Sequence, residues 1–201
     1  MNKNLAATAC RAELLDKAYG CLLGGLIGDA MGTPSEGLEP ADIERRFGWI
    51  EDFEGDGTDD SIMKYLLADA LIASDGYANA DDWAAQWLRQ HLHIGGEKTD
   101  RFFASTLHAM AKLRYGVLPR RVAVGHMPSS TAAMSIAPLG IVNAGHPQAA
   151  ATQAQEIASL VHIDETGFCQ DGAAAIAGLR RCRYAARLFS RRRACCGNGP
   201  S

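Results

Sequence analysis

A hydroxyl and two adjacent carboxylates, Thr58, Asp59 and Asp60, stand at the start of a segment whose apolar residues recur at helical spacing. The periodicity predicts a helix with Thr58 near its N-cap and both aspartates in its first turn. Three oxygen-bearing side chains at one helix end can form half of a ligand set for a hard divalent cation. They also suit plain capping, because a cap hydroxyl and first-turn acids satisfy unpaired N–H groups and complement the helix dipole. From these three residues alone, both interpretations stand.

The surrounding sequence favours the cation. Six acidic residues and no Lys or Arg lie between Glu51 and Asp60. Carboxylates at this density repel one another unless water or a cation separates them. Oxygen ligands of this kind favour Mg, Mn or Ca over Zn. An EF-hand calcium loop beginning at Asp52 is excluded, because its twelfth position must supply a bidentate Glu and is Met63 here.

Helices are expected to position these residues, because helical periodicity recurs along the chain and no run of alternating β-branched residues interrupts it. The predicted fold class is therefore all-α. One helix is expected from about Leu14 to Ala30, where Gly20, Gly24 and Gly28 would form a flat ridge that a neighbouring helix can approach closely. The stretch from Gly116 to Ser130 is the expected substrate loop.

Four motifs follow one another along the chain. They are Gly-Asp-Ala-Met-Gly-Thr-Pro-Ser-Glu (28–36), Thr-Asp-Asp-Ser-Ile-Met (58–63), Ala-Ala-Met-Ser-Ile-Ala-Pro-Leu-Gly (132–140), and Ser-Leu-Val-His (159–162) with a small-residue segment at 172–177. Together they resemble the ADP-ribosylglycohydrolase family, of the dinitrogenase-reductase-activating glycohydrolase type, over about residues 14–178. The resemblance implies a single-domain orthogonal helical bundle, incomplete at its C-terminus. It also implies hydrolysis at the anomeric carbon of ADP-ribose with two Mg or Mn ions.

Carried over residue by residue, the resemblance implies Thr58, Asp59 and Asp60 as metal ligands. It implies Glu36 and Asp60 as catalytic carboxylates that activate water or steady an oxocarbenium-like transition state. The substrate-binding residues that it implies are Ser129, Ser130, Thr131 and His162. Two departures concern the substrate, because Ser129 to Thr131 replaces the family's Gly-Asn-Gly and Ser135 stands where Arg is common. The expected ligand is an ADP-ribosylated protein or a small ADP-ribose or riboside compound, since small polar side chains suit a phosphate or a sugar.

The C-terminal part of the chain departs further from the family. Family members complete the metal site with an Asp-x-Asp-Thr motif on a later helix, and no such motif follows Asp171. Residues 178–201 instead contain seven arginines, three cysteines and no Asp or Glu. We expect a partial family domain over residues 1–178 and an arginine- and cysteine-rich tail over residues 179–201. A reading-frame shift or a rearranged gene end is the hypothesis for this tail, and a basic arm that binds nucleic acid or a membrane surface is the alternative.

Composition sets ordinary limits. A chain of 201 residues, 47% hydrophobic and 21% charged, can bury one sizeable core. Residues 1–11 lack the apolar stretch of a signal peptide, and the apolar run between Lys17 and Asp29 is too short to span a bilayer. These features predict a cytoplasmic protein with reduced thiols, and neither a membrane nor nucleic acid is the expected partner.

The function predicted from the sequence is a metal-dependent hydrolase of the ADP-ribosylglycohydrolase type. It would cleave an ADP-ribosyl or related N- or O-glycosidic bond, with activity impaired in this chain by the missing ligands. Two alternatives remain open. One is a catalytically inactive ADP-ribose-binding or structural relative, which the missing motif favours. The other is a hydrolase of another N-riboside, which the altered Ser129 to Thr131 segment suggests.

Overall fold

The computed structural model describes residues 3–53, 55, 57–90, 101–127 and 129–162. Every regular element within these residues is a helix, so the all-α prediction is confirmed. In chain order the elements are α1 (Lys3–Gly32), η1 (Thr33–Ser35), α2 (Pro40–Phe47), α3 (Asp59–Ala73), α4 (Ala80–Arg89), α5 (Ala104–Arg114), α6 (Pro119–Val122), α7 (Thr131–Ser135), α8 (Ala137–Val142) and α9 (Pro147–Ala158). The tail over residues 179–201 and the small-residue segment at 172–177 lie outside the described residues.

Helix α3 is the centre of the bundle and packs most extensively against α4 and α7. Its buried apolar side chains include Met63, Leu66 and Leu67. Two fully buried rings on α4, Trp83 and Trp87, pack edge to face with centroids 5.1 Å apart. Burial of a large ring contributes roughly 1.5–3 kcal/mol through the hydrophobic effect. Packing in the core therefore holds α3 in place, and with it the N-terminal end of α3.

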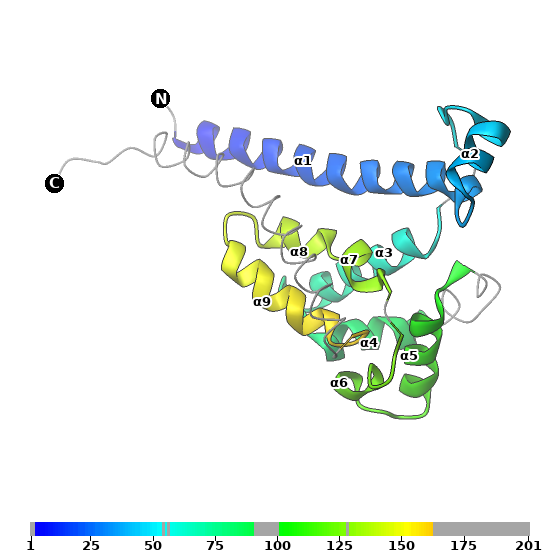
Figure 1. Ribbon diagram of the computed structural model, residues 1–201. Coiled ribbons are helices and arrows are strands. Elements are labelled where there is room, and N and C mark those ends of the chain that lie inside the picture. The colour runs from blue at the N-terminus through cyan, green and yellow to red at the C-terminus, as the bar shows by residue number, and fades with distance from the viewer. Residues whose placement is uncertain (1–2, 54, 56, 91–100, 128, 163–201) are drawn as a thin grey trace.

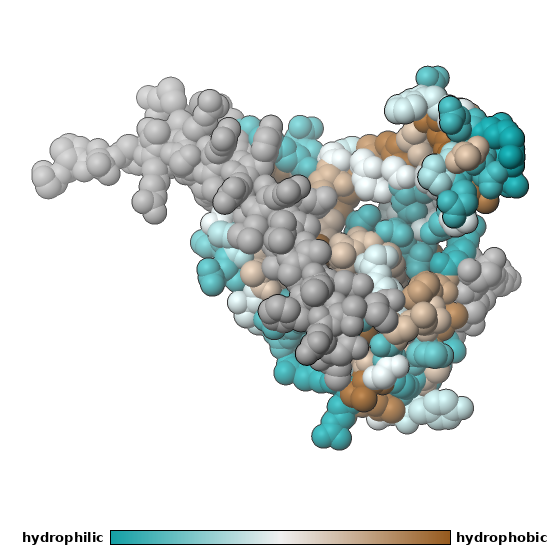
Figure 2. Space-filling model, viewed as in Figure 1, coloured by the Kyte–Doolittle hydropathy of each residue, from teal (hydrophilic) through white to brown (hydrophobic). Residues whose placement is uncertain are grey.

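Helix α1 runs along one side of the bundle, contacts α3 and α8, and ends next to α2 (Figure 1). It is longer at both ends than the predicted helix. No described atom lies within 4 Å of a Cβ built on Gly20, Gly24 or Gly28, so the expected close helix contact at this ridge is not found among the described residues. Polar side chains gather over α2 and apolar ones over the adjoining part of α1 (Figure 2). Of the described helices, none is both long and apolar enough to cross a membrane.

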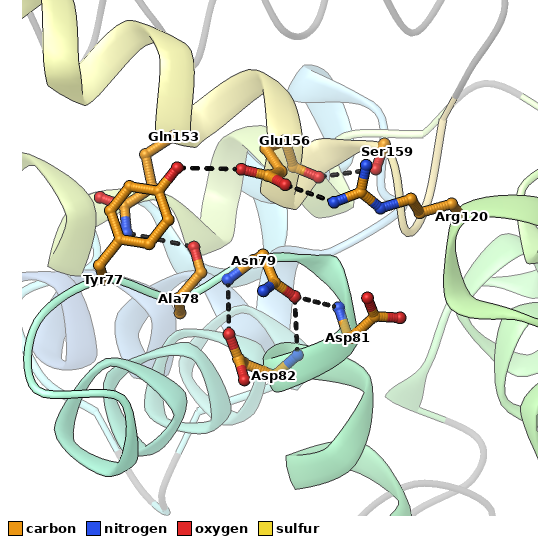
Figure 3. Close-up of polar contacts among 9 residues, drawn as sticks. All are labelled: Tyr77, Ala78, Asn79, Asp81, Asp82, Arg120, Gln153, Glu156 and Ser159. Atoms are coloured by element: carbon orange, nitrogen blue, oxygen red, sulfur yellow. Dashed lines mark hydrogen bonds and ion pairs between the residues drawn. The ribbon is translucent and has the colours of Figure 1, made fainter.

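The segment before α4 is tied to α9 by one buried residue (Figure 3). The Gln153 side chain, 1% exposed, donates from Nε2 to the carbonyl of Ala78 at 3.1 Å. Its Oε1 accepts from Asn143 Nδ2 at 2.6 Å. A buried amide whose two ends are both paired holds three segments in one register, because leaving any partner unpaired is costly.

A second link between the same regions lies at the surface. Glu156 of α9 accepts from Tyr77 Oη at 3.1 Å and from Arg120 Nη2 at 2.6 Å. Next to Tyr77, the Asn79 side chain caps α4, with Asp82 returning a bond to the Asn79 amide in a reciprocal capping box (Figure 3). An exposed ion pair such as that between Arg120 and Glu156 contributes about 0–1 kcal/mol to stability.

The buried and exposed links therefore differ in expected energy. Replacing Gln153 with Leu should lower the free energy of unfolding by roughly 1–3 kcal/mol, because the Ala78 carbonyl loses its Gln153 donor and Asn143 Nδ2 loses one of its acceptors. Replacing Glu156 with Ala should lower the free energy of unfolding by at most about 1 kcal/mol. Urea denaturation followed by circular dichroism measures both. Equal losses in the two variants would contradict the assignment of Gln153 as the stronger link.

Candidate functional site

The N-terminus of α3 has the predicted form. Thr58 is the N-cap residue, in an extended backbone conformation, and its hydroxyl accepts from the Asp60 amide at 3.4 Å. Asp59 and Asp60 occupy the first turn. Asp59 is buried with 6% exposure and Asp60 is half-buried. Two carboxylates removed from bulk water at one helix end are costly unless other groups compensate their charge.

Gly57 holds the turn that delivers Thr58 to the cap. Its φ is +78°, a left-handed conformation that favours glycine. Its carbonyl accepts from Arg101 Nη1 at 2.7 Å. A Cβ at this position would lie 2.5 Å from Asp29 Oδ2, so no larger side chain fits without moving that carboxylate. The turn is therefore fixed from two sides, by Arg101 and by Asp29 of α1.

Asp29 makes the densest set of contacts in the site. Its Oδ2 accepts from the Thr58 amide at 2.9 Å, from the Ser61 amide at 3.1 Å and from Ser61 Oγ at 2.6 Å. Its Oδ1 accepts from Thr58 Oγ1 at 2.7 Å. The sequence motif contained this residue, but nothing in its spacing indicated that it reaches across to α3. Arg101 was also missed, because no local pattern marks it.

Burial and repulsion between acids set the electrostatics of the site. Burial raises the pKa of Asp59 to about 6, the neighbouring Asp60 charge adds to the rise, and a backbone hydrogen bond from Phe103 opposes it. Burial and then the Asp29 charge raise the pKa of Asp60, while Lys64 lowers it. Burial also raises the pKa of Asp29, but hydrogen bonds from Ser61 and Thr58 outweigh burial and lower it overall. The positive charge near Asp59 and Asp60 therefore does not compensate their burial and mutual repulsion.

One cavity of about 170 Å³ joins most of the predicted site residues. Glu36, Asp59 and Asp60 supply its acidic lining, with Arg101 beside them. Ser129, Ser130 and Thr131 supply hydroxyls to the same cavity. Residues far apart in the sequence thus face one space. Carboxylates together with hydroxyls can hold a cation and a polyhydroxylated ligand side by side.

A second cavity of about 350 Å³ lies between α1 and α3. Gly25, Gly28 and Gly32 line it from α1, and Thr58, Asp60 and Lys64 line it from the α3 side. Glu36 and Asp60 border both cavities. These glycines thus leave room beside the acidic cluster, and Gly28 is the one of them that belongs to the predicted ridge.

A network of hydroxyls fixes the segment that contains Ser129. Ser129 Oγ accepts from Ser105 Oγ at 2.8 Å, donates to Thr131 Oγ1 at 3.0 Å and lies 3.2 Å from His162 Nε2. Thr131 Oγ1 lies 3.2 Å from Thr106 Oγ1. His162 is 2% exposed and reaches the first cavity through Ser129 rather than by lining it. Its predicted contact with a ligand stays a prediction.

The donor set fits a hard cation in part. Within the described ranges, no group of three or more His, Cys, Asp or Glu side chains lies close enough to hold a metal ion by itself. Thr58, Asp59 and Asp60 offer the oxygen ligands that Mg or Mn prefers. The charge of such an ion would also compensate the two carboxyls, whose pKa values are raised. Such an ion would take its remaining ligands from water, substrate or further residues.

The sequence is similar to that of known proteins. Over residues 11–192 the chain matches the family model described as ADP-ribosylglycohydrolase. An uncharacterized protein of Archaeoglobus fulgidus is 30% identical over 136 residues, covering 63% of this chain and 43% of that protein. The uncharacterized protein YegU of Escherichia coli K12 is 27% identical over 150 residues, covering 62% of this chain and 41% of that protein. The chain thus spans less than half the length of these curated relatives. With the family model matching most of its residues, the chain belongs to the ADP-ribosylglycohydrolase family.

Proposed function

We propose that this chain binds a divalent cation at a site of the ADP-ribosylglycohydrolase type. With that cation it cleaves a glycosidic bond to ADP-ribose or a related riboside. The observation that supports this most is the cavity where Glu36, Asp59 and Asp60 meet the hydroxyls of residues 129–131. Family membership supports a glycohydrolase-type reaction in general. The departures at Ser129 to Thr131 leave hydrolysis of another N-riboside as a variant of the same proposal.

Each side chain has a role in the proposed reaction. Thr58, Asp59 and Asp60 would hold Mg or Mn through oxygen atoms, and the bound ion would stabilise charge on the ribose hydroxyls and the attacking water. Glu36, exposed at the border of both cavities, would take the proton from that water. Asp60 would steady positive charge at the anomeric carbon. The hydroxyls of residues 129–131 would orient the ribose or phosphate by hydrogen bonds.

Residues 1–201 supply half of the family's ligand set, because no Asp-x-Asp-Thr follows Asp171 within them. A cation held by few protein ligands binds weakly and positions substrate poorly. This observation also favours a second candidate function. A chain with the cavity but without two firmly held ions would bind ADP-ribose without hydrolysing it.

The proposed site predicts weak cation binding that depends on the first turn of α3. Isothermal calorimetry with Mn²⁺ should give a dissociation constant of about 10⁻⁴ to 10⁻³ M, typical of weakly held hard cations. Replacing both Asp59 and Asp60 with Ala should abolish binding. Asp81→Ala is the matched control, because Asp81 lies in the acidic first turn of α4, exposed and away from the cavity. Tight binding of two ions, or binding that survives the double substitution, would contradict the half-site.

The raised pKa of Asp59 predicts how this affinity depends on pH. A cation competes with the Asp59 proton, so Mn²⁺ affinity should rise with pH up to about 6 and level off above it. In the Asp59→Asn variant, affinity should be lower throughout and this rise should be much smaller. Calorimetric titrations between pH 5 and pH 7.5, with the ionic strength held constant, measure both curves. A wild-type affinity that stays constant across this range would show that Asp59 does not take part.

Hydrolysis by residues 1–201 should be slow or undetectable, because few metal ligands position the water and the ribose. Release of ADP-ribose from O- and N-linked substrates, with and without Mn²⁺, measures it. If metal-dependent turnover is detected, Glu36→Gln should lower it by roughly 10²-fold or more while Mn²⁺ affinity changes little, as expected for a general base. Fast turnover that is unchanged in Glu36→Gln would contradict the assigned role.

A further inference from the structure

The carboxylate of Asp29 is held in place by hydrogen-bond donors from α3. Its two oxygens accept four bonds, from the amide and hydroxyl of Thr58 and from the amide and hydroxyl of Ser61. Oδ2 accepts three of these bonds and Oδ1 only the one from the Thr58 hydroxyl, so the carboxylate is held firmly between Thr58 and Ser61. Asp29 therefore lies beside the proposed cation site with a fixed orientation toward Thr58.

The shortest contact that involves Thr58 fixes the direction of its hydroxyl proton. Thr58 Oγ1 lies 2.7 Å from Asp29 Oδ1 and 3.5 Å from Asp60 Oδ2. A hydroxyl donates its one proton to the closer carboxylate, so the proton points to Asp29. Thr58 Oγ1 also accepts from the Asp60 amide at 3.4 Å, and Thr58 lines the cavity between α1 and α3.

We propose that Asp29 is a positioning residue that holds the Thr58 hydroxyl proton, so that Thr58 offers a lone pair rather than a proton to a divalent cation. The inference rests on the proposed function, since it concerns the same cation. A hydroxyl ligates a cation through oxygen, and a proton pointing into the site would repel the ion. Asp29 thus determines that Thr58 Oγ1 presents a lone pair, and not its proton, to the ion.

Capping of α3 alone does not account for a carboxylate at this place. Thr58 already caps the helix, and a neutral acceptor could satisfy the same amides without adding charge. A carboxylate at this place instead adds a third acid to the cluster, and Thr58 Oγ1 lies between Asp29 and Asp60. Asp29 also lies in the last turn of α1, where the helix dipole disfavours an acid. Gly57 accommodates this carboxylate, because a Cβ there would lie 2.5 Å from Asp29 Oδ2.

The isosteric variant Asp29→Asn tests the inference in the full chain. Its side-chain oxygen can still accept from the amides of Thr58 and Ser61, so α3 keeps its cap. Its NH₂ group would face Thr58 Oγ1, donate to it and turn the hydroxyl proton away. Mn²⁺ affinity measured by calorimetry should fall about tenfold or more, as for other residues that orient a ligand. Ser61→Ala is the matched control, since it removes a different hydroxyl from Asp29, and its affinity should stay within about twofold of the wild type.

A double-mutant cycle separates orientation of Thr58 from a general loss of charge or structure. In a Thr58→Val background no hydroxyl remains to orient, so Asp29→Asn should have no further effect on Mn²⁺ affinity. If Asp29→Asn leaves affinity unchanged in the wild-type background, or has its full effect without the Thr58 hydroxyl, the inference is wrong.

A measurement without metal keeps this inference separate from the proposed function. In the metal-free protein the Thr58 hydroxyl proton, buried and held by a 2.7 Å bond, should give a slowly exchanging NMR signal that Asp29→Asn removes. Failure of the wild type to bind Mn²⁺ would overturn the proposed cation site. A Thr58 hydroxyl proton that exchanges rapidly in the wild type would overturn the role of Asp29, whether or not metal binds.

Discussion

The carboxylate of Asp29 is the contact on which the candidate site depends, because it joins the end of α1 to the start of α3. Its four hydrogen bonds hold Thr58 and Ser61, and Arg101 holds the preceding carbonyl of Gly57 from the other side. Since α3 is fixed by the buried core, these bonds set where α1 ends relative to the first-turn acids. Glu36 follows α1 by only a few residues, so its position at the cavity depends on the same attachment.

The acids of the site oppose one another, and the fold compensates this repulsion only in part. Lys64 lowers the pKa of Asp60, while Asp29 raises it. Asp59 keeps a pKa of about 6, because its burial and the adjacent Asp60 outweigh the hydrogen bond from Phe103. A carboxyl in this state exchanges a proton near neutral pH, and a cation that replaces the proton would relieve burial and repulsion together. The energetic cost of the cluster is thus the physical reason to associate it with metal.

Local patterns predicted the features that depend on neighbouring residues. The cap at Thr58 and the acidic first turn of α3 follow from spacing alone, and the structure confirms them. Glu36 and the hydroxyls of residues 129–131 could be assigned only by family resemblance, because their meeting in one cavity depends on how the helices pack. The role of Asp29 was not predictable from either, since it depends on a contact across 29 residues of sequence. The close contact predicted at Gly20, Gly24 and Gly28 is not found among the described residues, and Gly28 instead lines the second cavity.

The two cavities differ in what they offer a ligand, and Asp60 lies between them. The cavity at residues 129–131 is lined by hydroxyls that a buried network fixes in place, which suits recognition of a sugar or phosphate. The cavity beside α1 is the larger, is walled by glycines and contains the flexible Lys64 side chain. Additional oxygen ligands for a cation at Asp60 have room to approach from this second side, whereas hydroxyls line the first side. A cation at the border would therefore lie between a wall of fixed hydroxyls and a side whose ligands the described residues only partly supply.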